Sequence, residues 1–428
     1  MTDIVIGDDD TSTRAWVLHP DITSERIRRA AEPALAEAVS LAAAMPDLEV
    51  VGATSVRLPK IHPGHLFGTG KIEELGKIFK EAKIVLVLID GTVSPVQQRN
   101  LEKAWQVKIL DRTGLILEIF SDRARTSEGV LQVEMAALSY QRTRLVRAWT
   151  HLERQRGGLG FVGGPGETQI ESDRRAIDEQ LTRLKRQMAK VVKTRTLHRD
   201  ARKKIPYPIV ALVGYTNAGK STLFNRLTGA EVFVKDMLFA TLDPTMRSVV
   251  LPSGREIIMS DTVGFISDLP TQLVAAFRAT LEEVLEADLI LHVRDISHHE
   301  TTEQARDVMA ILTDLGVSKE VPLFEVWNKM DLLEPEDAEP LQVTADRREN
   351  VFAISALTGA GLDEMLEAIS GVLTPQKFEH SFSLSFAQGK QRAWLHQQDV
   401  VEAETQTDTG FDVTVLWTAR QEKQFRDL

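Results

Sequence analysis

One stretch of the sequence has the residue types and the spacing of a phosphate-binding loop. Residues 214–222 read GYTNAGKST, which matches G-x-x-x-x-G-K-S/T, and they follow the apolar run IVALV at residues 209–213. This strand–loop–helix order lets backbone amides at a helix N-terminus surround an anion. In such a loop the lysine reaches the β- and γ-phosphates and the hydroxyl ligates Mg²⁺. We therefore predict that Lys220 and Ser221 hold a nucleoside triphosphate with its Mg²⁺.

Three further motifs also follow apolar, strand-like runs. DTVG follows EIIMS, NKMD follows PLFEVW, and SAL follows VFAI. In an open α/β sheet the ligand crevice lies at the carboxyl ends of the strands, so we expect these motifs to share one pocket with the loop. The predicted nucleotide contacts are Gly214, Tyr215, Thr216, Asn217, Ala218, Gly219, Lys220, Ser221, Thr222, Phe239, Ala240, Thr241, Leu242, Asp243, Asp261, Thr262, Val263, Gly264, Asn328, Lys329, Met330, Asp331, Ser355, Ala356 and Leu357.

The residue types in these motifs predict separate roles. The Asp331 carboxylate can accept hydrogen bonds from N1 and the exocyclic amino group of guanine, which adenine cannot supply. Thr241, within FATLDPT, is the predicted second hydroxyl ligand of Mg²⁺ after Ser221, and Asp261 is predicted to hold the ion through water. The predicted catalytic residues are Lys220, Thr241 and Gly264, whose amide can sense a γ-phosphate.

The residue after DTVG bears on the expected rate of nucleoside triphosphate hydrolysis. It is Phe265, where many GTPases carry a glutamine that orients the attacking water. We therefore expect hydrolysis to be slow in isolation, with another group positioning the water. Asn217 resembles the phosphate-loop asparagine that binds K⁺ in potassium-activated GTPases, and local capping of the loop is the alternative role for this residue.

Composition limits the classes of protein to consider. The 428 residues suggest roughly three domains, and 43% hydrophobic with 26% charged residues excludes a disordered or collagen-like chain. The sequence has no cysteine, so disulfides, thiolate metal sites and thiol redox chemistry are excluded. No apolar run approaches the roughly 18 residues that span a bilayer, and the acidic start MTDIVIGDDD is unlike a signal peptide. We expect a cytoplasmic protein without an obligatory membrane partner.

The net charge of −11 conceals an asymmetry along the chain. Residues 141–204 hold 17 Lys and Arg against 7 Asp and Glu, so this segment carries +10 and the remainder −21. Such a division indicates one element that faces a polyanion, attached to an acidic body. A solvated helix surface is the alternative explanation of the same charge.

Two heptad-like seams lie in and just before this basic segment and predict an antiparallel helical hairpin. The first joins Leu131, Met135, Leu138, Leu145, Trp149 and Leu152, with Arg142 in the skipped position, and the second joins Ile170, Ile177, Leu181, Leu184, Met188 and Val191.

The glycine-rich segment GGLGFVGGPGE lies between the seams, at the tip of the predicted hairpin. GLGFVG at residues 158–163 formally matches G-x-G-x-x-G, but a charged helix precedes it instead of a strand, so dinucleotide binding is rejected. Glycines let a backbone approach RNA phosphates closely, and arginines beside them neutralise the charge. A plain flexible turn is the alternative. The predicted RNA contacts are Arg154, Arg156, Gly157, Gly158, Gly160, Gly163, Gly164, Gly166, Arg174 and Arg175.

Apolar patterns outside these segments predict a small α/β domain before the hairpin and a small α+β domain at the end of the chain. Residues 14–19, 84–89 and 107–110 read as strands, residues 95–105 as a helix, and residues 24–45 as a helix with Ser24 as its N-cap. LFGTGK at residues 66–71 reads as a turn before a helix. Residues 380–386 and 411–417 alternate as half-buried strands do.

The predicted fold class is therefore α/β. A P-loop GTPase domain is preceded by a small α/β domain with a coiled-coil helical hairpin and followed by a small α+β domain. The expected boundaries are 1–125 for the first domain, 126–204 for the hairpin, 205–374 for the GTPase domain and 375–428 for the last domain.

At these motifs the sequence resembles the HflX family of ribosome-associated GTPases over nearly its whole length. The resemblance rests on residues 111–134, DRTGLILEIFSDRARTSEGVLQVE, on GGPGETQIESDRR at residues 163–175, and on GYTNAGKSTLFNRLT and LFATLDPT. GPGETQ is the most family-specific of these. The resemblance implies a factor that binds the large ribosomal subunit and its RNA, splits stalled or idle ribosomes and hydrolyses GTP, and some members are described as using ATP. The ribosome then joins K⁺ as a candidate for completing the hydrolytic site.

Two other functions remain open from the sequence. In one, the chain binds or remodels RNA, with nucleotide only regulating affinity or with ATP acting through the first domain. In the other, it is a tRNA-modification or ribosome-assembly GTPase that shares the same core, although the GPGETQ hairpin argues against this. In each case the predicted ligands are GTP or GDP with Mg²⁺, with K⁺ and ATP as further candidates, and the protein is expected to be a monomer off the ribosome.

Overall fold

The computed structural model describes residues 12–24, 30–155, 165–202, 207–230, 238–239, 241, 245–267, 282–374 and 377–426. Two compact units are present. The first contains residues Met1–Val249 and Ile257–Leu362, and the second contains Val250–Glu256 and Asp363–Leu428. Within the described residues, no helix is long and apolar enough to cross a membrane.

The described part of the chain begins with a four-stranded sheet in the order β2-β1-β3-β4, and every pairing in it is parallel. Its strands and helices are β1 (Thr13–Ile22), α1 (Ala31–Ala43), β2 (Leu48–Leu58), α2 (Thr69–Glu81), β3 (Leu86–Ile89), α3 (Pro95–Trp105), β4 (Lys108–Asp111) and α4 (Arg112–Arg123). This alternation is the βα order that a parallel sheet requires, because parallel strands need crossover connections.

Three of these strands and helix α3 confirm the sequence predictions, while two features differ. β2 was missed, because as an edge strand it has few buried positions to give it a clear pattern. The prediction of Ser24 as an N-cap was wrong: α1 begins at Ala31 after Ala30, which offers no side-chain cap. α2 begins just after LFGTGK, with Gly68 as N-cap, as expected for a turn before a helix.

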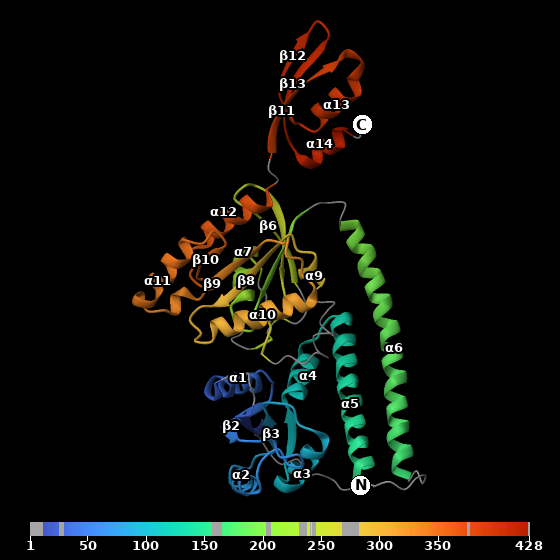
Figure 1. Ribbon diagram of the computed structural model, residues 1–428, viewed down its shortest axis with the longest axis vertical. Coiled ribbons are helices and arrows are strands. Elements are labelled where there is room, and N and C mark those ends of the chain that lie inside the picture. Colours follow the sequence, from blue (N-terminus) through green and yellow to red (C-terminus); the bar gives the residue numbers. More distant parts are fainter. Residues whose placement is uncertain are drawn as a thin grey trace. The chain divides into compact units, whose positions relative to one another are not determined.

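The predicted hairpin consists of two long helices, α5 (Ser127–Gln155) and α6 (Pro165–Arg202), which lie side by side (Figure 1). The seam residues Leu138, Leu181 and Leu184 are buried together, with Leu131, Met135 and Ile177 packed against them. At the skipped heptad position Arg142 forms an ion pair with Asp178 across the hairpin, at 3.0 Å. The heptad prediction is therefore confirmed for these six seam residues, whereas Met188 and Val191, further along α6, are half-buried and do not join this cluster.

A six-stranded sheet in the order β10-β9-β8-β5-β7-β6 follows the hairpin. β5 pairs in parallel with β7 and with β8, and β8 with β9. Five residues of β5 are fully buried, as expected for a central strand. The elements are β5 (Ile209–Gly214), α7 (Lys220–Thr228), β6 (Thr245–Val250), β7 (Glu256–Asp261), α9 (Glu282–Leu285), β8 (Leu289–Asp295), α10 (Thr301–Leu315), β9 (Leu323–Asn328), the 3₁₀ turn η1 (Met330–Leu332), α11 (Pro335–Asp346), β10 (Val351–Ala353) and α12 (Leu362–Leu373).

The last part of the chain forms a three-stranded antiparallel sheet in the order β11-β13-β12. Its elements are β11 (Lys377–Ser385), η2 (Phe386–Gln388), α13 (Gly389–Gln397), β12 (Val401–Thr407), β13 (Gly410–Thr418) and α14 (Ala419–Arg426). Leu384, Leu395 and Trp417 are at the centre of its core. The two strands predicted from alternating residues are β11 and β13, which are paired with each other.

One titratable side chain is buried in the middle of the six-stranded sheet. His292, in β8, is 2% exposed. Burial lowers the pKa of His292 to about 4, the positive charges of Arg294 and Lys220 act in the same direction, and Glu325 opposes them. The folded protein therefore holds this imidazole neutral at pH values where an unfolded chain protonates it.

We predict that His292 makes the fold sensitive to acid. Between pH 6.5 and about 4 the unfolded chain binds a proton that the folded chain does not, so the unfolding free energy falls as the pH falls, by about 3 kcal/mol over the window. In His292→Gln, urea midpoints followed by far-UV circular dichroism should depend less on pH across this range. The control His299→Gln, at an exposed histidine, should keep the parent slope; equal slopes in all three proteins would contradict the assignment.

Candidate nucleotide-binding site

The predicted phosphate loop connects the end of β5 with the start of α7, and two of its glycines are required by close contacts. A Cβ on Gly214 would lie 2.1 Å from the carbonyl oxygen of Val293 in β8. Gly219 has φ +92°, and a Cβ there would lie 2.1 Å from Nδ2 of Asn328. No other residue type fits at either position without displacing a neighbour.

The phosphate loop is hydrogen-bonded to the segment that follows DTVG. The Thr216 N–H donates to the Phe265 carbonyl at 2.7 Å, and the Phe265 N–H donates to the Gly214 carbonyl at 3.1 Å. Gly264 lies against the loop, because a Cβ on it would be 2.8 Å from Cγ2 of Thr216 and 2.9 Å from Nζ of Lys220. The structure therefore brings the first two predicted motifs into direct contact.

Lys220 is buried at the first residue of α7. Its Nζ donates to the carbonyl oxygens of Gly214, at 3.2 Å, and Tyr215, at 2.9 Å. Burial lowers the pKa of Lys220 to about 8, although the nearby Asp261 carboxylate acts in the opposite direction. Neutral carbonyls compensate a buried ammonium only in part, so an anionic phosphate oxygen would be a better partner.

Three side-chain oxygens meet at the end of β7. Oδ2 of Asp261 accepts hydrogen bonds from Ser221 Oγ, at 2.7 Å, and from Thr241 Oγ1, at 2.9 Å, and the two hydroxyls are 2.8 Å apart. The other carboxylate oxygen, Oδ1, is buried and has no hydrogen-bond partner in the described part of the chain. Burial raises the pKa of Asp261, while Lys220 and the two hydroxyls oppose this shift. Hard oxygen ligands and an orphaned carboxylate oxygen fit Mg²⁺ with a bound water.

Asn328, the first residue of NKMD, joins three of the predicted motifs. Its Nδ2 donates to the Ala218 carbonyl at 2.9 Å, and its Oδ1 accepts from the Ala356 N–H at 2.8 Å. The side chain is buried, so both bonds are shielded from water. Asn328 therefore connects the phosphate loop to the SAL motif.

The neighbouring residues of NKMD and SAL differ in exposure. Lys329 has φ +68° and pairs with Asp295 at 2.8 Å. Asp331 lies on the turn η1 with an exposed side chain. Ser355 is buried and its Oγ accepts the Thr358 N–H at 3.0 Å, whereas Leu357 is 69% exposed. An exposed acidic group at this edge can meet a ligand that arrives from solvent.

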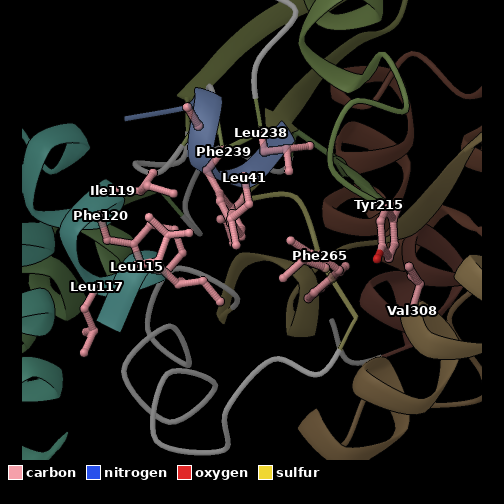
Figure 2. Close-up of a cluster of buried hydrophobic side chains, with 14 of the residues drawn as sticks. Leu41, Leu115, Leu117, Ile119, Phe120, Tyr215, Leu238, Phe239, Phe265 and Val308 are labelled. Atoms are coloured by element: carbon pink, nitrogen blue, oxygen red, sulfur yellow. The ribbon is translucent and has the colours of Figure 1, made fainter. Parts of the chain in front are cut away.

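Phe265 is enclosed by protein. Its side chain is 1% exposed and belongs to the hydrophobic cluster of Figure 2. It cannot orient a water molecule as a glutamine would. The two residues before Gly264, Thr262 and Val263, are buried as well, and Thr262 Oγ1 donates to the Leu212 carbonyl at 2.6 Å.

Some predicted residues lie elsewhere or outside the described part of the chain. Tyr215 lies in the loop, but its hydroxyl bonds to Glu37 and to Ser267. The sequence interpretation missed Glu37, Ser267 and their partner Arg112, because no motif marks them. Thr222 is half-buried on α7 and Met330 lies on η1. Ala240, Leu242 and Asp243 lie outside the described residues.

The predicted RNA contacts are described only in part. Arg174 and Arg175 lie on α6 with side chains 55% and 74% exposed. Arg154 and Gly166 lie within α5 and α6. The remaining predicted contacts, Arg156, Gly157, Gly158, Gly160, Gly163 and Gly164, lie outside the described residues, so the glycine-rich tip stays a prediction.

Four family models match this chain one after another. They are described as "GTP-binding GTPase N-terminal", residues 32–121, "GTP-binding GTPase Middle Region", residues 123–202, "50S ribosome-binding GTPase", residues 209–329, and "HflX C-terminal domain", residues 340–426. The GTPase HflX of Magnetococcus marinus is 47% identical over 400 residues, which cover 93% of this chain and 90% of that protein. The GTPase HflX of Escherichia coli K12 is 44% identical over 350 residues, covering 82% and 81%.

The chain belongs to the HflX family of GTPases. This confirms the resemblance drawn from GPGETQ and the GTPase motifs, and it confirms the fold class, with a P-loop GTPase domain between N-terminal and C-terminal domains of the HflX type. Among solved structures, a GTP-binding protein from Sulfolobus solfataricus in complex with GDP is 22% identical with a TM-score of 0.45, covering 84% of this chain and 98% of that chain.

Proposed function

We propose that this member of the HflX family is a Mg²⁺-dependent GTPase that binds the large ribosomal subunit and dissociates stalled or idle ribosomes. The observation that carries the proposal is the convergence of Lys220, Ser221, Thr241 and Asp261 at one end of a parallel sheet. The ribosomal partner is supported by the match of residues 209–329 to a model described as "50S ribosome-binding GTPase". A ribosomal partner places the protein in the cytoplasm, where we expect it to be a monomer between binding events.

In this proposal the chain's own groups hold and polarise the triphosphate. The loop amides and Lys220 bind the β- and γ-phosphates, and Ser221 and Thr241 would hold Mg²⁺ with Asp261 acting through water. A bound Mg²⁺ would supply positive charge against the charge that develops on the phosphates. Gly264 lies against Lys220, because a Cβ on it would be 2.9 Å from Nζ, and its amide is the proposed contact for a γ-phosphate oxygen.

The base would be selected by Asp331, whose exposed carboxylate can accept hydrogen bonds from N1–H and the 2-amino group of guanine. Asn328 supports this position indirectly, because its two backbone bonds fix the start of NKMD against the phosphate loop. ATP lacks both donors, so the proposed preference is for GTP.

We predict that Asp331→Asn exchanges the base preference. An asparagine can accept from N1–H and donate to the 2-oxo group of xanthine, so affinity for GTP should fall at least 100-fold while affinity for XTP rises. Competition with a fluorescent nucleotide would measure both affinities, and Asp337→Asn, on an exposed part of α11, provides the control. If GTP turnover disappears while ATP-driven RNA remodelling persists, the ATP-using alternative is favoured.

Hydrolysis needs a group that positions water, because the buried Phe265 does not. Asn217 is a candidate for holding K⁺ near the phosphates: its side chain is exposed, its φ is +59°, and within the described residues it makes no hydrogen bond that would cap the loop. We predict a GTPase rate several-fold higher in KCl than in NaCl at equal ionic strength, with the difference lost in Asn217→Ala. Rates that respond to neither K⁺ nor ribosomes would refute both proposed activators.

The hairpin is the proposed RNA-binding element. The two predicted contact arginines whose side chains are described pair with acids on the same helix: Arg175 with Glu171 at 2.8 Å, and Arg174 with Asp178 at 3.9 Å. Exposed ion pairs of this kind stabilise a protein by about 0–1 kcal/mol. Both arginines can therefore leave their acidic partners and bind an anion of higher charge density, such as an RNA backbone.

We predict that ribosome binding depends on both nucleotide state and hairpin charge. In co-sedimentation, the parent protein should be retained on large subunits with GTP or a non-hydrolysable GTP analogue and released with GDP. Reversing Arg174 and Arg175 to Glu should weaken binding at least 10-fold and reduce its salt dependence.

In the control variant, Arg306 and Lys319 are replaced by Glu, which changes the net charge by the same amount. Arg306 is exposed on α10, and Lys319 is exposed in the segment after it. Unchanged affinity of the hairpin variant would assign its charge to a solvated helix surface. Retention on precursor particles instead of mature subunits would favour a role in ribosome assembly.

A further inference from the structure

Arg112 is a buried charge that contacts both the N-terminal sheet and the GTPase domain. It is the first residue of α4 and is 6% exposed. Its guanidinium donates to Asp90 at 2.5 Å, to Glu37 of α1 at 2.5 Å, and to the carbonyl oxygen of Ser267 at 2.8 Å. Ser267 lies three residues after Gly264 of the DTVG motif, so Arg112 is hydrogen-bonded to the segment that follows this motif.

Glu37 extends this contact to the phosphate loop. Its second carboxylate oxygen accepts a hydrogen bond from the hydroxyl of Tyr215, the second residue of GYTNAGKST. The same hydroxyl accepts the Ser267 N–H at 2.7 Å and lies 2.7 Å from Ser267 Oγ. Arg112 and Glu37 therefore hold the phosphate loop and the DTVG segment in one buried polar network.

Phe239, close to Thr241 in the sequence, is held by apolar contacts with α4 and α1. Phe239, two residues before Thr241, packs edge-on against Phe120 of α4, with ring centroids 4.6 Å apart. Both rings are buried, and Leu41 of α1 joins the same cluster (Figure 2). Phe239 takes the left-handed backbone conformation at φ +57°, which is strained for an aromatic residue and persists only where the surroundings hold it.

Asp111, the residue before Arg112, binds the helical hairpin. It caps α4 by accepting the Gly114 N–H at 2.8 Å. The same carboxylate accepts the hydroxyl of Tyr140 at 2.6 Å and the guanidinium of Arg144 at 3.0 Å. Tyr140 and Arg144 both lie on α5, so the start of α4 is bonded to the hairpin as well as to the nucleotide site.

We propose that Asp111 and Arg112 are positioning residues that form a joint between the nucleotide site and the hairpin. Arg112 is expected to move with the DTVG segment and the phosphate loop, and Asp111 is hydrogen-bonded to α5. Because Asp111 and Arg112 are adjacent in the chain, a displacement of one is expected to displace the other. This inference rests on the proposed function, because it takes a guanine nucleotide to be the ligand that moves Ser267.

The burial of Arg112 is what makes the joint transmit a displacement. A buried guanidinium is costly to leave without its acceptors, so Arg112 and Ser267 are expected to move together when the γ-phosphate reorders the residues after Gly264. The bonds from Asp111 to α5 are formed at the first turn of the same helix, where its cap fixes the backbone. A rearrangement at the phosphates is thereby expected to reach the hairpin.

Spectroscopic labels test this without the ribosome. The chain has no cysteine, so Glu179→Cys on α6 and Lys319→Cys in the GTPase domain, both exposed, accept one pair of spin labels on the full chain. We expect the label–label distance measured by double electron–electron resonance to shift between GDP and a non-hydrolysable GTP analogue. In Tyr140→Phe, which removes the bond to Asp111 and keeps the ring, this shift should fall by at least half while nucleotide affinity stays unchanged.

The chain has three tyrosines, and Tyr207→Phe, at an exposed tyrosine outside the joint, is the matched control that should keep the full shift. Arg112→Lys keeps the charge and loses the planar fork, so its shift should fall as in Tyr140→Phe; if this buried variant does not fold, Tyr140→Phe decides. A parent protein that binds both nucleotides with identical distances, or a Tyr140→Phe protein with the parent shift, would overturn the joint. Failure of the parent to bind a fluorescent guanine nucleotide would instead refute the proposed function.

Discussion

The site depends on the parallel pairing of β5 between β7 and β8. In this register Leu212 lies opposite Asp261, and Gly214 lies opposite Val293, so the phosphate loop begins beside the last residue of β7. Because the carboxyl ends of parallel strands meet at one edge of a sheet, residues some 40 positions apart in the sequence come within hydrogen-bond distance. Ser221 and Asp261 are 2.7 Å apart for this reason. A side chain on Gly214 would separate the strands at this point, which explains why the motif begins with glycine.

This geometry places two buried charges that the protein alone compensates poorly. Burial lowers the pKa of Lys220 and raises that of Asp261, so in both cases the environment disfavours the charged form. A phosphate oxygen near the ammonium, and a cation near the carboxylate with its orphaned Oδ1, would each restore the missing partner. The site is in this sense electrostatically prepared for a polyanion with its metal ion, and it is less stable in their absence than a neutral, well-packed sheet edge would be.

The sequence predicted the parts of the site that depend on local spacing. The phosphate loop, DTVG and NKMD lie at strand ends as expected, and the heptad positions predicted which faces of α5 and α6 meet. Edge strand β2 was not predictable, because few of its positions are buried and its sequence shows no clear apolar pattern. The prediction of Ser24 as an N-cap was wrong, because α1 begins at Ala31. The Arg112 network was also beyond the sequence, because its partners Glu37 and Ser267 are 75 and 155 residues away and belong to no motif. Tyr215 is the clearest example of what the sequence does not predict. Its position in the phosphate loop was predictable, whereas the direction of its hydroxyl depends on Glu37 of α1, which is distant in the sequence.

The magnitude of these contacts decides whether the joint at Asp111 and Arg112 could matter. A coupling of 1–3 kcal/mol between two sites changes an affinity about 5- to 150-fold. One hydrogen bond to a charged group contributes about 1.5–3 kcal/mol, and Arg112 donates one such bond to Ser267 while Asp111 accepts two from α5. Weakening a single bond in one nucleotide state would therefore account for a coupling of this size, and no large rearrangement of the hydrophobic cluster around Phe120 is needed. The apolar contacts would then hold the N-terminal domain against the GTPase domain in every nucleotide state. The hydrogen bonds of the buried charges would be the contacts that differ between nucleotide states.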